Sequence, residues 1–284
     1  MYNAGLVLEG GGMKGMYTAG VLDFFLDKGI EFSSVYGVSM GACDMCSYLA
    51  KQRDRAFAVV ADYAKLHRYF SIESLIFTGN LFNVKMVYDT IPNRLYPFDY
   101  ETYKNYSGKA YAVATDIETG LPEYFRIKEL KADMEKIRAS ASLPLVSRNV
   151  KVDGKLYLDG GISNSIPLKK SIEDGNKKNI VVMTKEVGYI REPIGKKHLA
   201  LVRALYRKYP KVGELMADRH NMYNGELKYL DEQIKSGGAF LIQPKYKGNV
   251  GRIERDRDKL KVLYEQGYNE AAECYDEMKK YLEG

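Results

Sequence analysis

With 284 residues, the chain is long enough for one large domain, or for a domain with an appendage, around a substantial buried core. Its 45% hydrophobic and 28% charged residues are typical of a soluble globular protein, and its net charge of +6 comes without a basic and aromatic motif, so no nucleic-acid partner is expected. Two basic stretches, Lys196-Lys197 and Arg252–Lys261, are predicted to be solvated helix surface, with a weak attraction to anionic membrane surfaces as the alternative.

Short apolar runs alternate with amphipathic segments from the N-terminus onward. Residues 4–8 and 32–38 are predicted strands, and residues 13–28 and 41–51 are predicted helices. This β-α-β-α order is typical of an α/β fold with parallel strands. Residues 55–107 are rich in Tyr and Phe and lack strong strand signals, so we expect a helical cap with loops there.

The segment after the cap returns to strand patterns. We predict strands at residues 109–116, 123–127 and 179–184, a helix at 130–141, and a hairpin at 150–158. The hairpin turns at Asp153-Gly154, a dipeptide that favours tight turns.

From residue 186 the composition shifts to long charged helices. One strand, at residues 239–243, interrupts them, and a final amphipathic helix covers residues 260–282. We therefore predict an α/β domain over residues 1–185 and a mainly helical extension, residues 186–284, packed on it.

Cysteine usage and the N-terminus bear on the compartment. Cys43, Cys46 and Cys274 cannot form a paired framework, and we expect Cys43 and Cys46 to be reduced core residues rather than a metal or redox pair. The first residues lead directly into a strand without a signal peptide, and no apolar run approaches the ~20 residues that span a bilayer. These features predict a cytoplasmic protein.

A serine between glycines, Gly37-Val38-Ser39-Met40-Gly41, ends the second predicted strand. A sharp strand-to-helix turn lifts the serine hydroxyl clear of the backbone, and the flanking glycines relieve the crowding. This is the geometry of a nucleophilic serine, although the pattern alone is weak evidence.

A glycine run, Gly10-Gly11-Gly12, lies between the first strand and the first helix. Backbone amides in such a loop can point into one cavity, where the helix N-terminus adds positive potential. We expect an oxyanion-binding loop, because acyl transfer needs donors for the developing negative charge.

Gly10, Gly12 and Gly15 also fit the Gly-x-Gly-x-x-Gly pattern of dinucleotide sites. Such a site needs an acidic residue at the end of the second strand. Here that strand ends at Ser39, and Glu31 precedes it, which argues against nucleotide binding. A purely structural turn is the other alternative.

The serine also needs a base. Of the three histidines, His198 and His220 formally fit the order of a Ser-acid-His triad, but both lie in charged helical surroundings typical of a surface. Asp159 is the stronger candidate, because it follows an apolar run and precedes Gly160-Gly161, where an extended segment breaks into a turn.

Taken together, these motifs resemble the three-block signature of the patatin-like phospholipases. The resemblance covers roughly residues 4–185, and the C-terminal segment is similar to that of bacterial members of the YjjU type. The main blocks are Glu9-Gly10-Gly11-Gly12-Met13-Lys14-Gly15, Gly37-Val38-Ser39-Met40-Gly41 and Asp159-Gly160-Gly161; softer ones are Ala114-Thr115-Asp116 with Thr119-Gly120, and Ala139-Ser140-Ala141-Ser142-Leu143-Pro144.

The resemblance implies a three-layer α/β sandwich with a central, mainly parallel sheet flanked by helices. It implies a Ser–Asp dyad in which Ser39 attacks an acyl ester and Asp159 takes its proton, through an acyl-enzyme intermediate. The amides of Gly11 and Gly12, with help from Met13, would hold the oxyanion. No metal or organic cofactor is implied.

The implied substrate is a phospholipid or another acyl ester, reached through transient contact with a membrane surface. The aromatic segment 63–103 is either the acyl-chain cleft or lid, or plain core. Lys14 stands where relatives usually have arginine, so bidentate contacts at that position would be lost. The alternative function is a catalytically weak or inactive lipid-binding adaptor on the same fold.

Overall fold

The computed structural model describes all 284 residues, and one eight-stranded mixed sheet forms its centre. Its strands are β1 (Tyr2–Leu8), β2 (Phe32–Val38), β3 (Lys109–Asp116), β4 (Pro122–Arg126), β5 (Val150–Val152), β6 (Lys155–Asp159), β7 (Asn179–Val182) and β8 (Phe240–Ile242). They follow the order β5-β6-β3-β2-β1-β7-β8, and β4 also pairs with β3. The run from β3 to β8 is parallel, whereas the pairings of β4, β5 and β6 are antiparallel.

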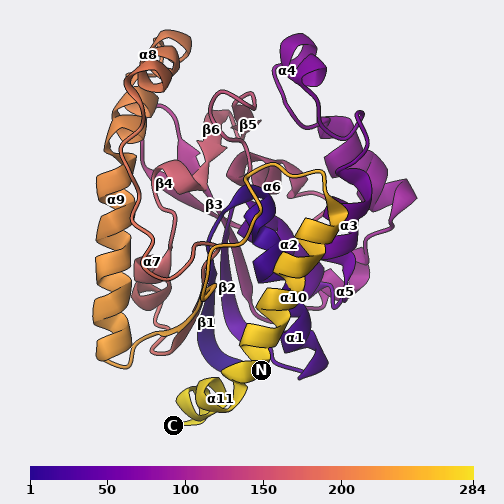
Figure 1. Cartoon of the computed structure of the whole chain (residues 1–284), viewed down its shortest axis with the longest axis vertical. Helices are drawn as coiled ribbons and strands as arrows, with labels where there is room; N and C mark the ends of the chain where they lie inside the picture. Colours follow the sequence, from indigo (N-terminus) through magenta and orange to yellow (C-terminus); the bar gives the residue numbers. More distant parts are fainter.

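Helices cover both faces of this sheet, which gives three layers (Figure 1). In that view α9 lies on one side of the sheet, and α1, α2 and α10 lie on the other. The helices are α1 (Met16–Asp27), α2 (Met40–Leu49), α3 (Arg55–Tyr63), α4 (Ile72–Thr78), α5 (Tyr100–Lys104), α6 (Met134–Ser140), α7 (Leu168–Glu173), α8 (Lys196–Leu205), α9 (Pro210–Lys235), α10 (Arg257–Glu273) and α11 (Tyr275–Glu283), with 3₁₀ turns η1 (Gly12–Gly15) and η3 (Gly160–Ile162) and a π-helix η2 (Met86–Leu95). The predicted α/β class and helical cap are confirmed.

Strand β1 shows why the central strands read as continuous apolar runs. Leu6 and Leu8 belong to the large hydrophobic cluster shared with α1, α2 and α10, whereas Val7 between them belongs to a second cluster shared with α9. Alternate side chains of a strand point to opposite faces, so a sheet covered on both sides needs apolar residues at every position.

The C-terminal segment is part of the same sheet and the same core. Strand β8 pairs in parallel with β7, and α10 packs closely on α1. A Cβ at Gly20 of α1 would lie 2.0 Å from the Tyr264 carbonyl oxygen, and a Cβ at Gly267 of α10 would lie 2.0 Å from the Tyr17 carbonyl oxygen. Glycine at both positions therefore allows the two helix backbones to touch. The division into a domain of residues 1–185 and an extension of residues 186–284 therefore remains a prediction.

The final amphipathic segment differs from the expectation of one helix. It forms two helices, α10 and α11, which meet at Cys274. The apolar stripe continues through both, since Leu263, Ala271 and Met278 are all buried in the main cluster. Every helix of the protein is too short or too polar to traverse a lipid bilayer.

Candidate active site

Ser39 occupies the sharp turn between β2 and α2. Its backbone has φ 55° and ψ −121°, in the left-handed half of φ space that non-glycine residues rarely adopt. The flanking glycines permit the turn: a Cβ at Gly37 would lie 2.6 Å from the Ala42 Cα, and one at Gly41 would lie 2.6 Å from the Leu8 carbonyl oxygen. Such local strain is characteristic of a nucleophile elbow.

The glycine loop after β1 lies directly against this turn. A Cβ at Gly10 would be 2.7 Å from the Ser39 Cβ, so only glycine allows this approach. The amides of Gly11 and Gly12 donate to no group of the protein, and both residues line a small polar cavity with Ser39. They are therefore free to bind a negatively charged oxygen at the serine.

Met13 differs from its expected place in the oxyanion loop. Its amide donates to the Arg252 carbonyl oxygen over 3.0 Å, because the loop before α10 crosses the start of η1. The third predicted donor is thus already occupied, which leaves Gly11 and Gly12.

Asp159 reaches Ser39 because two strands share one edge of β3. Strand β4 pairs with one edge of β3 over residues 111–115. On the opposite edge, β2 pairs with β3 up to Val113, and β6 pairs with β3 from Ala114 onward. Strands β2 and β6 therefore lie on the same edge, end toward end. Val38 lies opposite Val113, and Asp159 lies opposite the next residue, Ala114. This arrangement places Asp159 beside the residue that follows Val38.

The Asp159 carboxyl is buried, with only one of its oxygens occupied. Its Oδ1 accepts the Gly161 amide at 2.8 Å, and its Oδ2 has no hydrogen-bond partner. Burial raises the pKa of Asp159 above its ordinary value, while the Ser39 hydroxyl and then the Arg219 guanidinium oppose that rise. Ser39 and Asp159 line the same small cavity, and no hydrogen bond of ordinary geometry joins their side chains.

The segment from Ala139 to Pro144 fixes the backbone on both sides of the pair. The Ser140 hydroxyl oxygen accepts the Ser39 amide at 3.0 Å, and the Ser142 carbonyl oxygen accepts the Asp159 amide at 2.8 Å. One short stretch at the C-terminal end of α6 therefore holds both candidate catalytic residues.

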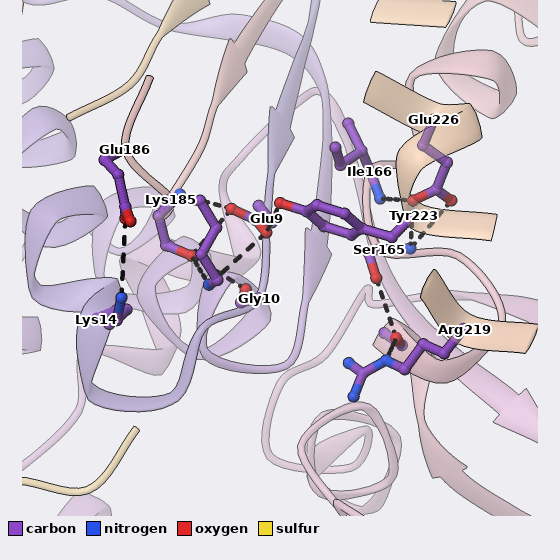
Figure 2. Close-up of polar contacts among 12 residues, drawn as sticks. Glu9, Gly10, Lys14, Ser165, Ile166, Lys185, Glu186, Arg219, Tyr223 and Glu226 are labelled. Atoms are coloured by element: carbon purple, nitrogen blue, oxygen red, sulfur yellow. Dashed lines mark hydrogen bonds and ion pairs between the residues drawn. The ribbon is translucent and has the colours of Figure 1, made fainter. Parts of the chain in front are cut away.

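Lys14 and the histidines lie apart from this pair. The Lys14 ammonium is 4.0 Å from the Glu186 carboxylate (Figure 2), and Lys14 does not line the small cavity. His198 is exposed on the wall of a larger cavity, and the ring of His220 contacts the Ala217 carbonyl oxygen of its own helix. Neither histidine lines the small cavity with Asp159.

Four cations that the sequence did not identify as site residues line the small cavity with Ser39 and Asp159. They are Lys185, Arg191, Arg219 and Arg252. Arg252 was expected on solvated helix surface, but it precedes α10 and faces the candidate site. No local sequence pattern connects the four, since they come from separate segments of the C-terminal part.

A large apolar cavity opens beside the serine. Its volume is about 540 Å³, within the range of ligand sites, and 25 of its 39 lining residues are hydrophobic. The aromatic segment contributes to the wall, so it is more than plain core; its lining side chains include Tyr69, Phe82, Tyr88 and Phe98. Cys43 and Cys46, both free, lie on the α2 wall of the same cavity.

The family model described as patatin-like phospholipase matches residues 6–170, more than half of the chain. The chain belongs to the patatin-like phospholipase family. A second model, a domain of unknown function (DUF6363), matches residues 209–283.

Several known proteins are similar to this patatin-like chain. An uncharacterized protein of Escherichia coli, YjjU, is 32% identical over 63% of this chain and 51% of its own length. A probable lipid hydrolase, 463L of Invertebrate iridescent virus 6, is 25% identical over 63% of this chain and 66% of its own length. The matched region thus spans about half of YjjU and about two thirds of 463L. The structure of VipD from Legionella pneumophila aligns over 98% of this chain and 67% of VipD, with 11% identity and a TM-score of 0.45.

Proposed function

We propose that this protein is a serine lipid acyl hydrolase that cleaves acyl esters through a Ser39–Asp159 dyad. The observation that carries the proposal is the strained Ser39 turn, set between the unpartnered Oδ2 of Asp159 and the free amides of Gly11 and Gly12. Membership of the patatin-like phospholipase family and the similarity to a probable lipid hydrolase support a lipid substrate.

In the proposed reaction, Ser39 Oγ attacks the ester carbonyl carbon and its proton passes to Asp159 Oδ2. The amides of Gly11 and Gly12 stabilise the oxyanion. As the intermediate collapses, the alcohol leaves with the proton from Asp159, and an acyl-Ser39 ester remains. Water then attacks this ester, with Asp159 again as the base, and releases the carboxylic acid.

The large apolar cavity supports an acyl chain as the bound group. It shares Ser39 and Gly12 with the small polar cavity, so a chain that lies in it can present its carbonyl group at the serine. Burial of each CH₂ group of the chain contributes about 0.8 kcal/mol to binding.

We propose further that the protein meets its substrate at a membrane surface. Helix α4 exposes Ile72, Ile76 and Phe77 by 73%, 72% and 78%, and α8 exposes Leu201 and Leu205. Helices α4 and α8 lie toward the same end of the molecule, away from both termini (Figure 1). Two apolar edges at one end suit insertion into the headgroup region.

Labelling with a fluorophosphonate probe tests the hydrolase directly. We expect one adduct in the intact-protein mass, mapped to Ser39, and none in the Ser39→Ala variant. Hydrolysis of p-nitrophenyl butyrate should follow the same pattern, while His198→Ala and His220→Ala stay within about threefold of wild type, since general-base loss costs about 10²–10⁴-fold. Absence of both adduct and turnover would favour the lipid-binding adaptor, and a several-hundredfold loss in a histidine variant would favour a triad.

Phe77→Ser tests the membrane contact separately. We expect weaker hydrolysis of phospholipid in vesicles and unchanged hydrolysis of soluble p-nitrophenyl butyrate. Equal vesicle activity in wild type and variant would contradict the proposed contact.

A further inference from the structure

Two tyrosine hydroxyls in the large apolar cavity have no hydrogen-bond partner in the protein. Tyr69 and Tyr88 both line the cavity, Tyr69 buried and Tyr88 half-buried. Burial raises the pKa of both hydroxyls, and no hydrogen bond to another group offsets the rise. A tyrosine hydroxyl withdrawn from bulk water ordinarily finds a partner. Here both oxygens are left open to a ligand in the cavity.

Most other buried tyrosines of this protein follow the ordinary rule. Their hydroxyls donate to a carboxylate or a backbone carbonyl oxygen; these are Tyr17, Tyr36, Tyr48, Tyr103 and Tyr223. The two hydroxyls of the cavity therefore stand out against the rest of the core. An unpartnered polar group in a native structure needs an explanation, and a ligand that supplies the missing partner is one.

Helix α2 adds further polar groups to the cavity wall. Cys43 and Ser47 follow Ser39 at four-residue steps, so all three lie on one side of the helix, and all three line the cavity. Asp44 lines the cavity as well, and neither of its carboxyl oxygens has a partner. Burial, followed by the charge of Asp23, raises the pKa of Asp44 well above its ordinary value. This favours the protonated carboxyl, which can donate a hydrogen bond.

The tyrosines and the α2 wall belong to one part of the cavity. The Cys43 thiol adds to the raised pKa of both hydroxyls, and the Tyr69 hydroxyl adds to that of Tyr88. The Tyr69 ring packs edge-on against Phe82, with ring centres 5.7 Å apart, which fixes its direction. Tyr88 lies in the π-helix η2, a rare form of helix that frequently occurs at functional sites.

The chemistry of these groups defines the acyl chain that suits them. A plain alkyl chain in the cavity would displace water from the hydroxyls and leave them without any partner, which costs binding free energy. A chain with a hydroxyl group at the same level can both donate to them and accept from them. A site built to bond a substrate hydroxyl discriminates strongly against the analogue that lacks it.

We propose that Tyr69 and Tyr88, with Asp44 and Ser47 of α2, form a hydroxyl-binding subsite in the large cavity, so that esters of hydroxylated acyl chains are preferred to esters of plain chains. This inference rests on the proposed hydrolase function and specifies the acyl group of its substrate. None of the four residues lines the small polar cavity, which remains the place of the oxyanion.

The test compares p-nitrophenyl decanoate with p-nitrophenyl esters of hydroxydecanoic acids that differ in the position of the hydroxyl group, with the full-length protein. Because the tyrosines occupy fixed places on the wall, wild type should prefer, by kcat/KM, the esters with the hydroxyl at a particular position. Tyr69→Phe and Tyr88→Phe should each reduce this preference about tenfold. Both variants should fold, since neither hydroxyl bonds to the protein.

Tyr63→Phe is the matched control. The Tyr63 ring lies against that of Tyr69, with ring centres 6.2 Å apart, but Tyr63 does not line the cavity. Its preference should stay within about twofold of wild type. A preference for hydroxylated chains that Tyr69→Phe and Tyr88→Phe leave unchanged would assign the selection to other residues and overturn the subsite.

A binding measurement does not depend on turnover. At least one free hydroxydecanoic acid should raise the Tm of Ser39→Ala more than decanoic acid does, and the difference should disappear in Ser39→Ala/Tyr88→Phe. Equal hydrolysis and equal binding of plain and hydroxylated chains, in a protein that still gives the Ser39 adduct, would overturn the inference and leave the hydrolase intact. Selective binding in a protein that gives neither adduct nor turnover would overturn the hydrolase and leave the subsite.

Discussion

Arg219 donates a hydrogen bond from Nε to the carbonyl oxygen of Gly161 over 2.6 Å, and this contact joins helix α9 to the turn that follows Asp159. The guanidinium also lowers the pKa of the Asp159 carboxyl, against the larger effect of burial, which raises it. A residue 60 positions further along the chain thus tunes the candidate base.

The pH dependence of hydrolysis should reveal the effect of Arg219 on the pKa of Asp159. A general base must be ionised, so activity should fall as the pH drops through the pKa of Asp159, which lies above the ordinary value of about 3.9. Arg219→Gln removes a positive charge and should move the acidic limb of kcat/KM to higher pH, whereas Arg219→Lys should move it less. The limb is measured with p-nitrophenyl butyrate, an uncharged ester. A limb that stays in place in Arg219→Gln would contradict the coupling.

Asp159→Asn should separate activity from stability. We expect kcat to fall by at least about 10²-fold, because the amide cannot take the Ser39 proton. The folded protein binds the Asp159 proton more tightly than the unfolded chain does, so stability decreases as the pH rises from about 3.9 through the raised pKa. Above that range the ionised carboxyl opposes folding, and the Tm of the variant at pH 7 should equal or exceed that of wild type.

Asp116→Asn is the control for this comparison. Asp116 is also buried at a strand end and accepts the amides of Glu118 and Thr119, but it does not line the small cavity. Its activity should stay near that of wild type. Activity of Asp159→Asn within tenfold of wild type would rule out the dyad.

Gly10→Ala should damage the site through its backbone. The new Cβ would lie 2.7 Å from the Ser39 Cβ and 2.9 Å from the Val38 carbonyl oxygen, so the loop must move. We expect a loss of about 1–3 kcal/mol in the free energy of unfolding and a loss of about 10²-fold in kcat. Gly225→Ala, in the open middle of α9, should instead stabilise by about 0.5–1 kcal/mol in urea denaturation. Wild-type activity in Gly10→Ala would show that the loop does not bind the oxyanion.

Tyr223→Phe should measure the anchor beneath the glycine loop. The Tyr223 hydroxyl donates to the buried Glu9 carboxylate over 2.7 Å. Removing this charged hydrogen bond should lower the free energy of unfolding by about 1.5–3 kcal/mol. Tyr229→Phe is the matched control on the same helix, because Tyr229 packs against the same cluster and does not contact Glu9, and its effect should be within about 0.5 kcal/mol. Equal effects of the two variants would show that the Glu9 contact contributes nothing.

Most strands and helices of the fold could be predicted from local sequence patterns. The strands predicted at residues 4–8, 32–38 and 109–116 are present, because continuous apolar runs are what a sheet covered on both faces requires. The break at Cys274 between α10 and α11 was not foreseen, since the apolar stripe of the sequence runs through it. The pairing of β2 and β6 with one edge of β3 could not be derived either, because strand pairing depends on contacts remote in sequence.

In the candidate site, too, some residues could be predicted from the sequence and others could not. The turn at Ser39 requires glycines next to the serine, so this part of the site appears in the sequence as a short and specific motif. Arg191, Arg219 and Arg252 show no such pattern, because each is one of several charged residues in its segment and only the tertiary fold brings the three together. The occupied amide of Met13 depends on the same long-range contact with Arg252.

The close contact of Gly20 with α10 sets the size of the smallest useful fragment. Helix α1 continues from the glycine loop, and its outer face is covered by a helix that begins only at Arg257. A fragment cut at the end of the family match would expose that face and lose every arginine of the small cavity. For this chain, the region by which the family is recognised is shorter than the unit that must be expressed to obtain an intact pocket.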